Sequence, residues 1–302
     1  MLTIDFRTSI KEDTVAETTV FQVVATDDDH LPENTRLRYS IIKGNTDHAF
    51  LMNEATGSIT LARMIDHENV ANYTLTVSVT DSGAPPLSST AVVHVTVLDV
   101  NDNTPEFSPP AYEIEVREDV PIDSNVVTVL AKDHDTGDNA RVLYSIISWN
   151  NNTFGIDRDT GVISVRAKLN FESRAFYRLN VSASDCSLEN PRRTAFAVVS
   201  INVTDVNEHR PQFSAIIYIV SVVENQPNGT YVFTSQASDR DGGRYGVVRY
   251  RLIPENLKDE GMLKIDPETG VVTTNKWLTY FLNNGAAERY HFKVSLGLNS
   301  LC

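Results

Sequence analysis

The chain repeats itself at an interval of 106 residues, and this period constrains its fold more strongly than any other feature. Glu118 lies 106 residues after Glu12, and Glu224 lies 106 residues after Glu118. The same interval separates two sets of aspartates: Asp27, Asp133 and Asp239, and Asp29, Asp135 and Asp241. A fixed period indicates tandem copies of one structural unit. Because 302 residues exceed what one hydrophobic core usually organises, the chain is predicted to contain three units.

Within each unit, apolar residues occupy every second position, which is the pattern of half-buried strands. One such set is Tyr73, Leu75, Val77 and Val79 in the first unit, and Tyr177, Leu179, Val181 and Ala183 in the second. A later strand carries Val93, Val95 and Val97 in the first unit, and Val199, Ile201 and Val203 in the second. No segment has a sustained helical stripe. About 100 residues of short alternating strands per unit predict an all-β fold of tandem Greek-key, immunoglobulin-like β-sandwiches.

Short links separate the predicted units at residues 99–105 and 205–211, and both contain Asp-Val-Asn followed by a proline. Neither link contains glycine, so neither is a flexible Gly/Ser tether. The predicted units are residues 1–103, 104–209 and 210–302. Something other than the links must therefore set how neighbouring sandwiches sit on one another.

Composition excludes several classes of protein. A net charge of −14 argues against a nucleic-acid partner, because phosphate binding requires clustered Lys and Arg. No run approaches the roughly 20 apolar residues that cross a bilayer, and residues 1–6 lack the regions of a secretory signal, so a surface role requires a longer parent chain. With only Cys186 and Cys302, a disulfide framework is excluded. A structural Cys186 is favoured over one that pairs with another chain.

Acidic residues gather at predicted strand ends and in the links. Carboxylates, asparagine amides and backbone carbonyls are all hard oxygen ligands, and no His or Cys cluster has transition-metal spacing. Calcium binds about six to eight oxygens in loose geometry. This donor set favours calcium over magnesium or zinc.

The motifs then resemble those of the cadherin superfamily over essentially the whole chain. Asp99-Val100-Asn101-Asp102-Asn103 matches the cadherin linker Asp-x-Asn-Asp-Asn at every fixed position. Asp66-His67-Glu68 resembles the Asp-x-Glu element, and Lys11-Glu12-Asp13 resembles the x-Glu-x element. In the second unit, Asp133-His134-Asp135 with Asn139 resembles the Asp-x-Asp loop, and Asp185 resembles the later single Asp.

The resemblance implies about three calcium ions between the first and second repeats. The outermost ion would be held by Glu12, Asp66, Glu68 and Asp102. A second would use Glu12, Glu68, Asp99, Asp102, Asp135 and the Val100 carbonyl. The third would use Asn101, Asp133, Asp135, Asp185 and the carbonyls of Asn103 and Asn139. Because such clustered carboxylates repel one another strongly, we expect calcium to convert a floppy junction into a rigid rod.

The second junction departs from the family pattern. Asn170 replaces the Asp of the Asp-x-Glu element, and Glu208 and His209 follow Asn207 where Asp and Asn are usual. The acids that remain are Glu118, Glu172, Asp205, Glu208, Asp239 and Asp241, six against eight at the first junction. We therefore predict fewer or weaker calcium ions there. Replacement of Asn by His is expected to matter little if only its backbone carbonyl coordinates the ion.

The third repeat departs further from the pattern. Residues 277–281 (Trp-Leu-Thr-Tyr-Phe) stand where an Asp-x-Glu element belongs, and Leu298 stands where the late Asp should fall. The sequence stops before a last strand or a further link. The prediction is a truncated or alternatively spliced, marginally stable repeat with an unsealed sheet edge.

Competing interpretations of the acids fail on their own requirements. An EF-hand beginning at Asp133 would need Glu at its twelfth position, where Tyr144 stands. A metalloprotease motif at His67-Glu68 would need a second His, where Ala71 stands. Glycosidase acids would need a sugar platform, and the glycines at 242–246 match no phosphate loop. The prediction is a non-enzyme without a small-molecule substrate.

The resemblance implies calcium-dependent adhesion to other cadherin ectodomains at the outer face of the plasma membrane. The alternative is a calcium-stiffened spacer inside a giant cadherin. Strand-swapping cadherins use a Trp near the N-terminus, whereas Trp149 and Trp277 are distant from it, which favours a long nonclassical cadherin of the Fat, Dachsous or protocadherin kind. Glycosylation acceptor motifs begin at Asn72, Asn151, Asn180, Asn202 and Asn228.

Overall fold

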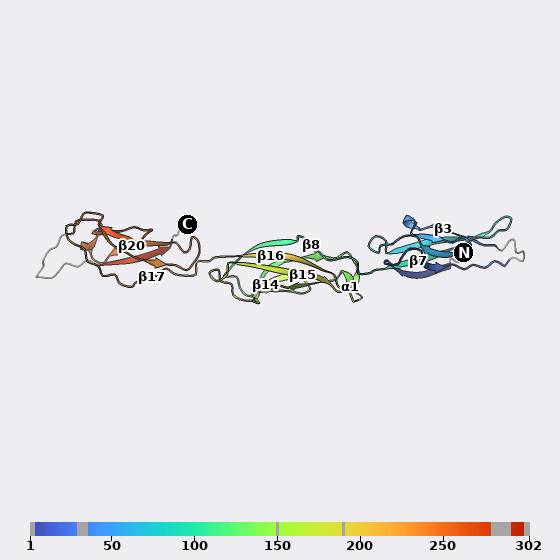
Figure 1. The fold of residues 1–302 in the computed structure, drawn as a ribbon, viewed down its shortest axis with the longest axis horizontal. Coiled ribbons are helices and arrows are strands. Elements are labelled where there is room, and N and C mark those ends of the chain that lie inside the picture. Colours follow the sequence, from blue (N-terminus) through green and yellow to red (C-terminus); the bar gives the residue numbers. More distant parts are fainter. Residues whose placement is uncertain (1–3, 29–35, 149–150, 189–190, 279–290, 299–302) are drawn as a thin grey trace.

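The computed structural model describes residues 4–28, 36–148, 151–188, 191–278 and 291–298. Three β-rich units follow one another along the long axis of an extended molecule (Figure 1). Strands, turns and loops make up nearly all of the described residues, which confirms the predicted all-β class. Asp29 and the segment 279–281, on which predictions were made, lie outside the described residues.

The first repeat contains two sheets that face each other across its core. Its elements are β1 (Ile4–Lys11), β2 (Thr19–Gln22), β3 (Arg38–Lys43), the 3-10 turn η1 (Thr46–His48), β4 (Phe50–Met52), β5 (Ser58–Leu61), β6 (Asn72–Thr80) and β7 (Ser88–Leu98). One sheet has the order β1-β7-β6-β3, and the other has the order β2-β5-β4. β1 runs parallel to β7, and the remaining pairings are antiparallel.

The second repeat reproduces this arrangement and adds a short strand pair. Its elements are β8 (Glu106–Phe107), β9 (Ala111–Arg117), β10 (Asn125–Thr128), β11 (Ala131–Lys132), α1 (Gly137–Ala140), β12 (Val142–Ile146), β13 (Phe154–Ile156), β14 (Val162–Val165), β15 (Phe176–Asp185) and β16 (Thr194–Thr204). Its sheets are β12-β15-β16-β9, β10-β14-β13 and β11-β8. The one α-helix of the described ranges, α1, is a single turn that follows the Asp133–Asp135 loop, in keeping with the absence of a helical stripe in the sequence.

The described part of the third repeat contains counterparts of most of these strands. Its elements are β17 (Gln212–Phe213), β18 (Tyr231–Thr234), β19 (Ala237–Ser238), β20 (Val248–Pro254), the 3-10 turn η2 (Leu257–Asp259), β21 (Leu263–Ile265), β22 (Val271–Thr274) and β23 (Phe292–Leu298). They form the sheets β18-β22-β21, β17-β19 and β20-β23. β20 and β23 pair antiparallel, as β12 and β15 do in the second repeat.

The alternating residues predicted to be apolar and inward do form the cores of the first two repeats. Leu75 and Val93 are fully buried in the first, as are Leu179 and Val199 in the second. Their neighbours along each strand point outward, which is the expected consequence of a side-chain period of two. Each of the first two repeats therefore has a separate core, and its loops are free to face the next repeat.

A tyrosine, buried in the first two repeats and half-buried in the third, ties each sandwich to the segment that leads into its Asp-x-Asp loop. The hydroxyl of Tyr144 accepts a hydrogen bond from the Ala131 amide at 2.9 Å, two residues before Asp133. The hydroxyls of Tyr39 and Tyr250 accept the corresponding hydrogen bonds from the amides of Ala25 and Ala237. The tyrosine thus fixes the position from which the acidic loop starts.

The ring of the same tyrosine covers the turn at Thr160-Gly161, a Thr-Gly pair that recurs at 56–57 and 269–270. Gly161 has φ +70°, and a Cβ there would lie 2.3 Å from the Val129 carbonyl and 3.3 Å from the Tyr144 ring. Glycine is required because it alone adopts positive φ freely and leaves room for this close approach. Gly57 and Gly270 have the same surroundings in their repeats.

We expect Tyr144→Phe to destabilise the second repeat by about 1–3 kcal/mol, because the buried Ala131 amide loses its partner. Urea denaturation followed by circular dichroism would measure this. The matched control is Tyr112→Phe, whose hydroxyl accepts a more exposed bond from Leu130 and whose loss should cost less. Equal effects from the two variants would contradict the anchoring role.

Candidate metal centres at the junctions

Each junction is organised around a buried glutamate at the end of the first strand. Glu12 is only 3% exposed, and its two carboxylate oxygens accept hydrogen bonds from the amides of His67 at 2.6 Å and Val100 at 2.7 Å. Glu118 is 1% exposed and accepts from Phe171 at 2.8 Å and Val206 at 2.7 Å. One carboxylate therefore joins the strand end, the Asp-x-Glu position and the link in both junctions.

The first link is also attached to the repeat that follows it. Asp99 accepts hydrogen bonds from the Thr136 amide at 3.2 Å and from the Asn139 side chain at 2.9 Å. The Asn103 amide donates to Asp135 at 3.0 Å. These bonds hold the carboxylates of the link directly against the loop after β11.

The second link is attached in the same way. Asp205 accepts from the Gly242 amide at 2.8 Å, and the His209 amide donates to Asp241 at 3.1 Å. Asp239 accepts from the Asp241 amide at 3.1 Å, as Asp133 does from Asp135 at 3.0 Å. The backbone frame of the two junctions is therefore the same despite the substitutions.

The late aspartate closes the first junction from the side of the second repeat. Asp185 has no exposed surface and accepts from the Asn101 side chain at 3.1 Å and from the Arg193 amide at 2.6 Å. The Arg193 side chain donates to the Asn101 carbonyl at 3.0 Å. Arg193 is a contact of this centre that sequence reasoning did not find, since it belongs to no acidic motif.

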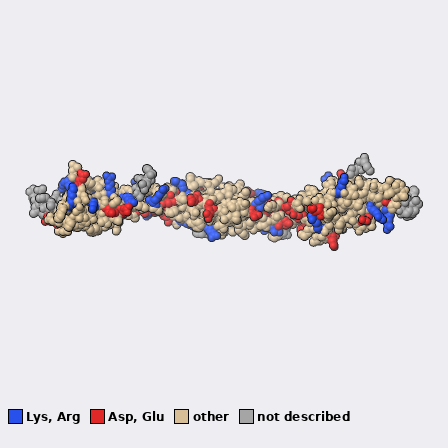
Figure 2. All heavy atoms as spheres, turned by 90° about the horizontal axis from the view of Figure 1, so that it is seen from above, with Lys and Arg blue, Asp and Glu red and all other residues tan. Residues whose placement is uncertain are grey.

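The predicted acidic residues converge into compact groups with ligand atoms within 4.8 Å of one another. The groups at the first junction are Glu12 with Asp66 and Glu68, and Glu68 with Asp102 and Asp135. Those at the second are Glu118 with Glu172 and Asp205, and Glu172 with Glu208 and His209. Acidic side chains gather at the narrow part between the first and second repeats (Figure 2).

Several carboxylate oxygens in these groups are buried without a hydrogen-bond partner. They are Asp99 Oδ1, Asp133 Oδ2 and Asp135 Oδ2 at the first junction, and Asp205 Oδ1 and Asp239 Oδ2 at the second. Buried carboxylate oxygens are costly unless a donor or a cation satisfies them. The candidate ligand atoms around these carboxylates are all oxygens, except for the imidazole nitrogens of His209. The residues present therefore fit calcium.

The pKa values show the same electrostatic conflict. Partial desolvation among the other acids, followed by the nearby charge of Glu12, raises the pKa of Glu68 to about 8 although the residue is exposed. Burial also raises the pKa values of Asp102, Asp133 and Asp205. Without cations, these junctions therefore favour partial protonation over a full set of negative charges.

Two of the three substitutions at the second junction, Asn170 and His209, keep its shape but change its charge. Asn170 accepts from the Ser173 amide at 2.7 Å, as Asp66 does from Asn69 at 3.1 Å, so the turn persists while one negative charge is lost. The His209 ring lies 2.7 Å from Asp241, a contact that raises the pKa of His209. The Asn103 side chain donates to Asp135 at the matching place. The exchange of Asn for His therefore acts through the side chain as well as the backbone, because the His209 ring contacts Asp241 directly.

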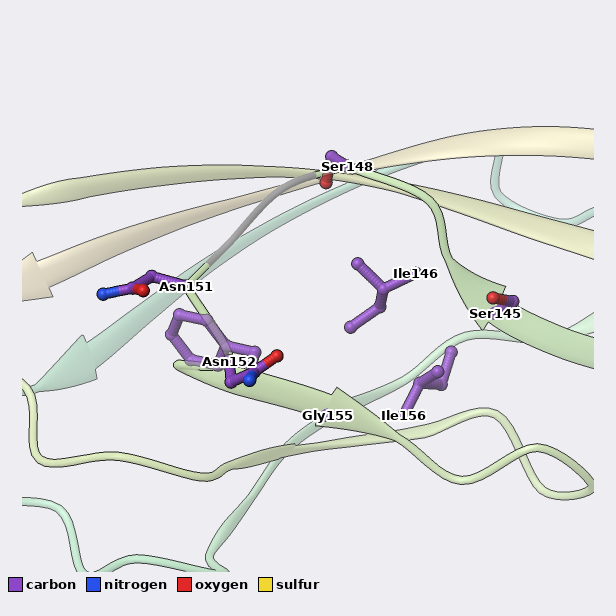
Figure 3. Close-up of a pocket in the computed structure, with 8 residues that line it drawn as sticks. Ser145, Ile146, Ser148, Asn151, Asn152, Gly155 and Ile156 are labelled. Carbon is purple, nitrogen blue, oxygen red and sulfur yellow. The ribbon is translucent and has the colours of Figure 1, made fainter.

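A shallow pocket on the second repeat lies away from both junctions. Ser148, Asn151 and Asn152 surround it, and Ile146 and Ile156 project toward its centre (Figure 3). Among the described residues that line it there is no acidic side chain, histidine or cysteine. The pocket therefore offers no group suited to acid–base chemistry, and the junctions remain the candidate site.

Comparison with known proteins agrees with this geometry. The family model described as "Cadherin domain" matches residues 6–98, 112–204 and 218–296. The chain belongs to the cadherin family. Human Protocadherin-23 is 35% identical over 292 residues, which cover 91% of this chain and 9% of that protein. Human Cadherin EGF LAG seven-pass G-type receptor 3 is 36% identical over 278 residues, which cover 91% and 8%.

A solved structure extends the comparison to three repeats. The crystal structure of mouse cadherin-23 EC22-24 superposes with a TM-score of 0.80 at 30% identity, covering 98% of this chain and 90% of that one. These relatives confirm the expectation of a nonclassical cadherin. The chain spans less than a tenth of the two curated relatives named above. Within the described residues, no helix is long and apolar enough to cross a membrane.

If Glu68 is a calcium ligand, the calcium affinity of the first junction should rise roughly 50-fold from pH 6 to pH 8, because calcium must displace the proton that Glu68 retains up to about pH 8. For the calcium-free fold the sign is opposite: its stability falls over this range, since the unfolded chain has already released that proton. Isothermal titration calorimetry at three pH values would measure the affinity. Glu68→Gln should flatten the profile, and an unchanged profile in that variant would contradict the assignment.

Proposed function

We propose that this chain is a segment of a cadherin ectodomain that supports calcium-dependent cell–cell adhesion through rigid tandem repeats. Cadherin repeats generally bind calcium, and the observation that carries the proposal here is the set of buried, unpartnered carboxylate oxygens at both junctions. Its partners would be other cadherin ectodomains, of the same or a related type. The proposed location is the outer face of the plasma membrane, within a longer single-pass protein.

At the first junction, the residues that would hold calcium come from both repeats and from the link. They are Glu12, Asp66, Glu68, Asp99, Asp102, Asp133, Asp135 and Asp185, with the oxygens of Val100, Asn101, Asn103 and Asn139. Eight carboxylates face about three divalent cations, so most of the repulsion is neutralised when the ions bind. Since the ligands belong to two rigid sandwiches, binding would fix their relative orientation. The repeat boundaries near residues 103 and 209 are part of the same proposal.

At the second junction, Glu118, Glu172, Asp205, Asn207, Glu208, Asp239 and Asp241 would hold fewer or weaker ions. The backbone hydrogen bonds match those of the first junction, but Asn170 carries no negative charge. The His209 ring already contacts the Asp241 carboxylate. The lower charge reduces the attraction for a divalent cation. The rod would therefore bend more readily at this junction when calcium is scarce.

Glycans on the proposed acceptors would be compatible with this arrangement. Asn72, Asn151, Asn180, Asn202 and Asn228 are all exposed. Asn180 and Asn202 lie on the outward faces of β15 and β16, so a glycan there would not enter the core. None of the five belongs to the acidic groups at the junctions.

Small-angle X-ray scattering tests the stiffening. With calcium we expect the maximum dimension and the sharp distance distribution of a straight rod, and with chelator a broader distribution, because the junction acids then repel one another. Glu12→Gln should lose most of the calcium effect at the first junction. Asp119→Asn, which removes only a surface ion pair with Arg117, is the control. A profile insensitive to chelator would contradict the proposal.

Repair of the second junction tests its predicted weakness. The double variant Asn170→Asp, Glu208→Asp restores the charge and the shorter arm found at the first junction. Calorimetric titration should then show the weaker class of sites gain about tenfold in affinity, since one carboxylate is added in a partly buried place. Affinities already equal at the two junctions of the unmodified chain would show that the substitutions are neutral.

A calcium-stiffened spacer without partner recognition is the second candidate, because the chain spans only a small part of its relatives. Bead aggregation separates the two. Beads that carry this chain should aggregate in calcium and disperse in chelator if the segment itself adheres. Dispersed beads in both conditions, together with calcium-dependent scattering, would favour the spacer.

A further inference from the structure

Two phenylalanines of the second repeat lie on the surface, although phenylalanine is otherwise a core residue in this chain. Phe176 is 49% exposed and Phe196 is 64% exposed. Every other phenylalanine of the described ranges is buried or half-buried. A single exposed apolar residue usually needs no explanation, but these two share one face of one sheet, and their neighbours on it are specific.

Both rings lie on the outward face of the sheet β12-β15-β16-β9. The strands β15 and β16 run side by side in the middle unit (Figure 1). Tyr177 and Ala197, which follow the two phenylalanines in sequence, are buried in the core. Because side chains alternate between the two faces of a strand, Phe176 and Phe196 point away from the core.

Each ring has a glycosylation acceptor as its neighbour across the strand pair. Phe176 is directly opposite Asn202 in the register of β15 and β16. Phe196 is opposite Ser182, the hydroxyl residue of the Asn180 acceptor motif, and is therefore diagonal to Asn180. Opposite Cβ atoms are about 5 Å apart and diagonal neighbours about 7–8 Å apart, which an aromatic ring can span. A sugar on either asparagine would start beside a phenylalanine.

The first repeat lacks both members of the diagonal pair. In the register of β6 and β7, Thr76 and Thr90 occupy the positions that Asn180 and Phe196 occupy in the second repeat. The exposed ring and the acceptor are thus both present in one repeat and both replaced by threonine in the other.

Asn72 supplies a contrasting acceptor on the equivalent face of the first repeat. It is opposite Thr96, at the position where the second repeat pairs Phe176 with Asn202. The Thr96 hydroxyl donates a hydrogen bond to the Asn72 side chain at 3.2 Å. The residue across the strand pair from this acceptor is therefore polar, and a glycan on Asn72 would have no phenylalanine opposite it.

We propose that Phe176 and Phe196 form a carbohydrate-binding surface, on which the first sugars of N-linked glycans at Asn202 and Asn180 pack. The inference rests on the proposed extracellular location, since such glycans belong to secreted and surface chains. One face of a sugar ring carries mainly C–H groups, whose partial positive charge suits the negative face of an aromatic ring. Packing also removes apolar area of the phenylalanine from water.

The attachment itself leaves the geometry of the sheet unchanged. The asparagine side-chain nitrogen forms a bond to C1 of the sugar, the pyrophosphate of a lipid-linked sugar donor leaves, and one amide proton is lost. The glycan then stays tethered beside the ring at a high effective concentration. A separate protein would have to displace it, so this face is a glycan-covered surface, and partner recognition by the second repeat would use another one.

Site-resolved release of the glycans by a peptide N-glycosidase tests the proposal on the whole 302-residue chain, folded and secreted from cultured animal cells. The enzyme hydrolyses the bond between asparagine and sugar and leaves aspartate, so mass spectrometry follows each site separately. Phe196→Thr should speed release at Asn180 about tenfold, the factor that corresponds to about 1.4 kcal/mol, and leave Asn202 unchanged. Phe176→Thr should do the reverse, so each variant is the control for the other.

Phe196→Tyr retains the ring and should keep release at Asn180 slow. Threonine has high β propensity and both positions are exposed, so the variants should fold, and the tyrosine variant keeps the test decisive if one does not. Release rates that ignore both threonine variants would overturn the proposal, as would unglycosylated Asn180 and Asn202 in the secreted chain.

Bead aggregation and scattering separate this proposal from its alternatives. Beads that carry the double variant Phe176→Thr, Phe196→Thr should behave in calcium like beads with the unmodified chain. A loss of aggregation confined to the double variant would show that the rings bind a partner protein, and would overturn the proposal. Ring-dependent release in a chain whose scattering is insensitive to calcium would support it and count against the proposed adhesion alone.

Discussion

Buried like charges at the junctions are the constraint on which the rest of the structure depends. Glu12 and Asp185 are almost inaccessible, and parts of Asp99, Asp133 and Asp135 are buried without donors. Each of the first two repeats has its own apolar core, so neither sandwich needs such an arrangement for its own packing. Burial of these acids therefore costs free energy that is shared by two neighbouring repeats, and bound cations would offset this cost.

The cores, turns and tyrosines of the sandwiches serve to place these acids. Tyr144 fixes the strand before Asp133, Gly161 allows the turn beneath the Tyr144 ring, and Glu118 joins three segments at the opposite end. Short links without glycine leave little freedom of their own. The orientation of one repeat on the next thus depends on what the carboxylates bind, which connects an electrostatic balance to the mechanics of an extended molecule.

Much of the fold could be predicted from the sequence because its signals are periodic. Leu75, Val93, Leu179 and Val199 follow the two-residue alternation and are buried. The 106-residue interval correctly indicated that Glu12 and Glu118 occupy equivalent positions, and both make the same pair of backbone contacts. The same interval, to within one residue, also relates three tyrosines, Tyr39, Tyr144 and Tyr250. Their hydrogen bonds to a neighbouring segment could not be predicted, because the alternation of apolar residues does not reveal them.

Other features depend on contacts between distant segments, which spacing alone does not reveal. Arg193 reaches the Asn101 carbonyl from the end of the hairpin that follows Asp185, and no motif marks it. The ring of His209 takes the place of an asparagine amide, although the two side chains share little chemistry.

The central claim is that the two junctions hold different amounts of calcium. Native mass spectrometry of the whole chain, titrated with calcium, counts the bound ions directly. The account predicts about three ions bound first and lost selectively in Glu12→Gln, followed by a smaller, weaker set lost in Glu118→Gln. A chain that binds no calcium specifically, or that fills both junctions equally and at the same concentration, would contradict it.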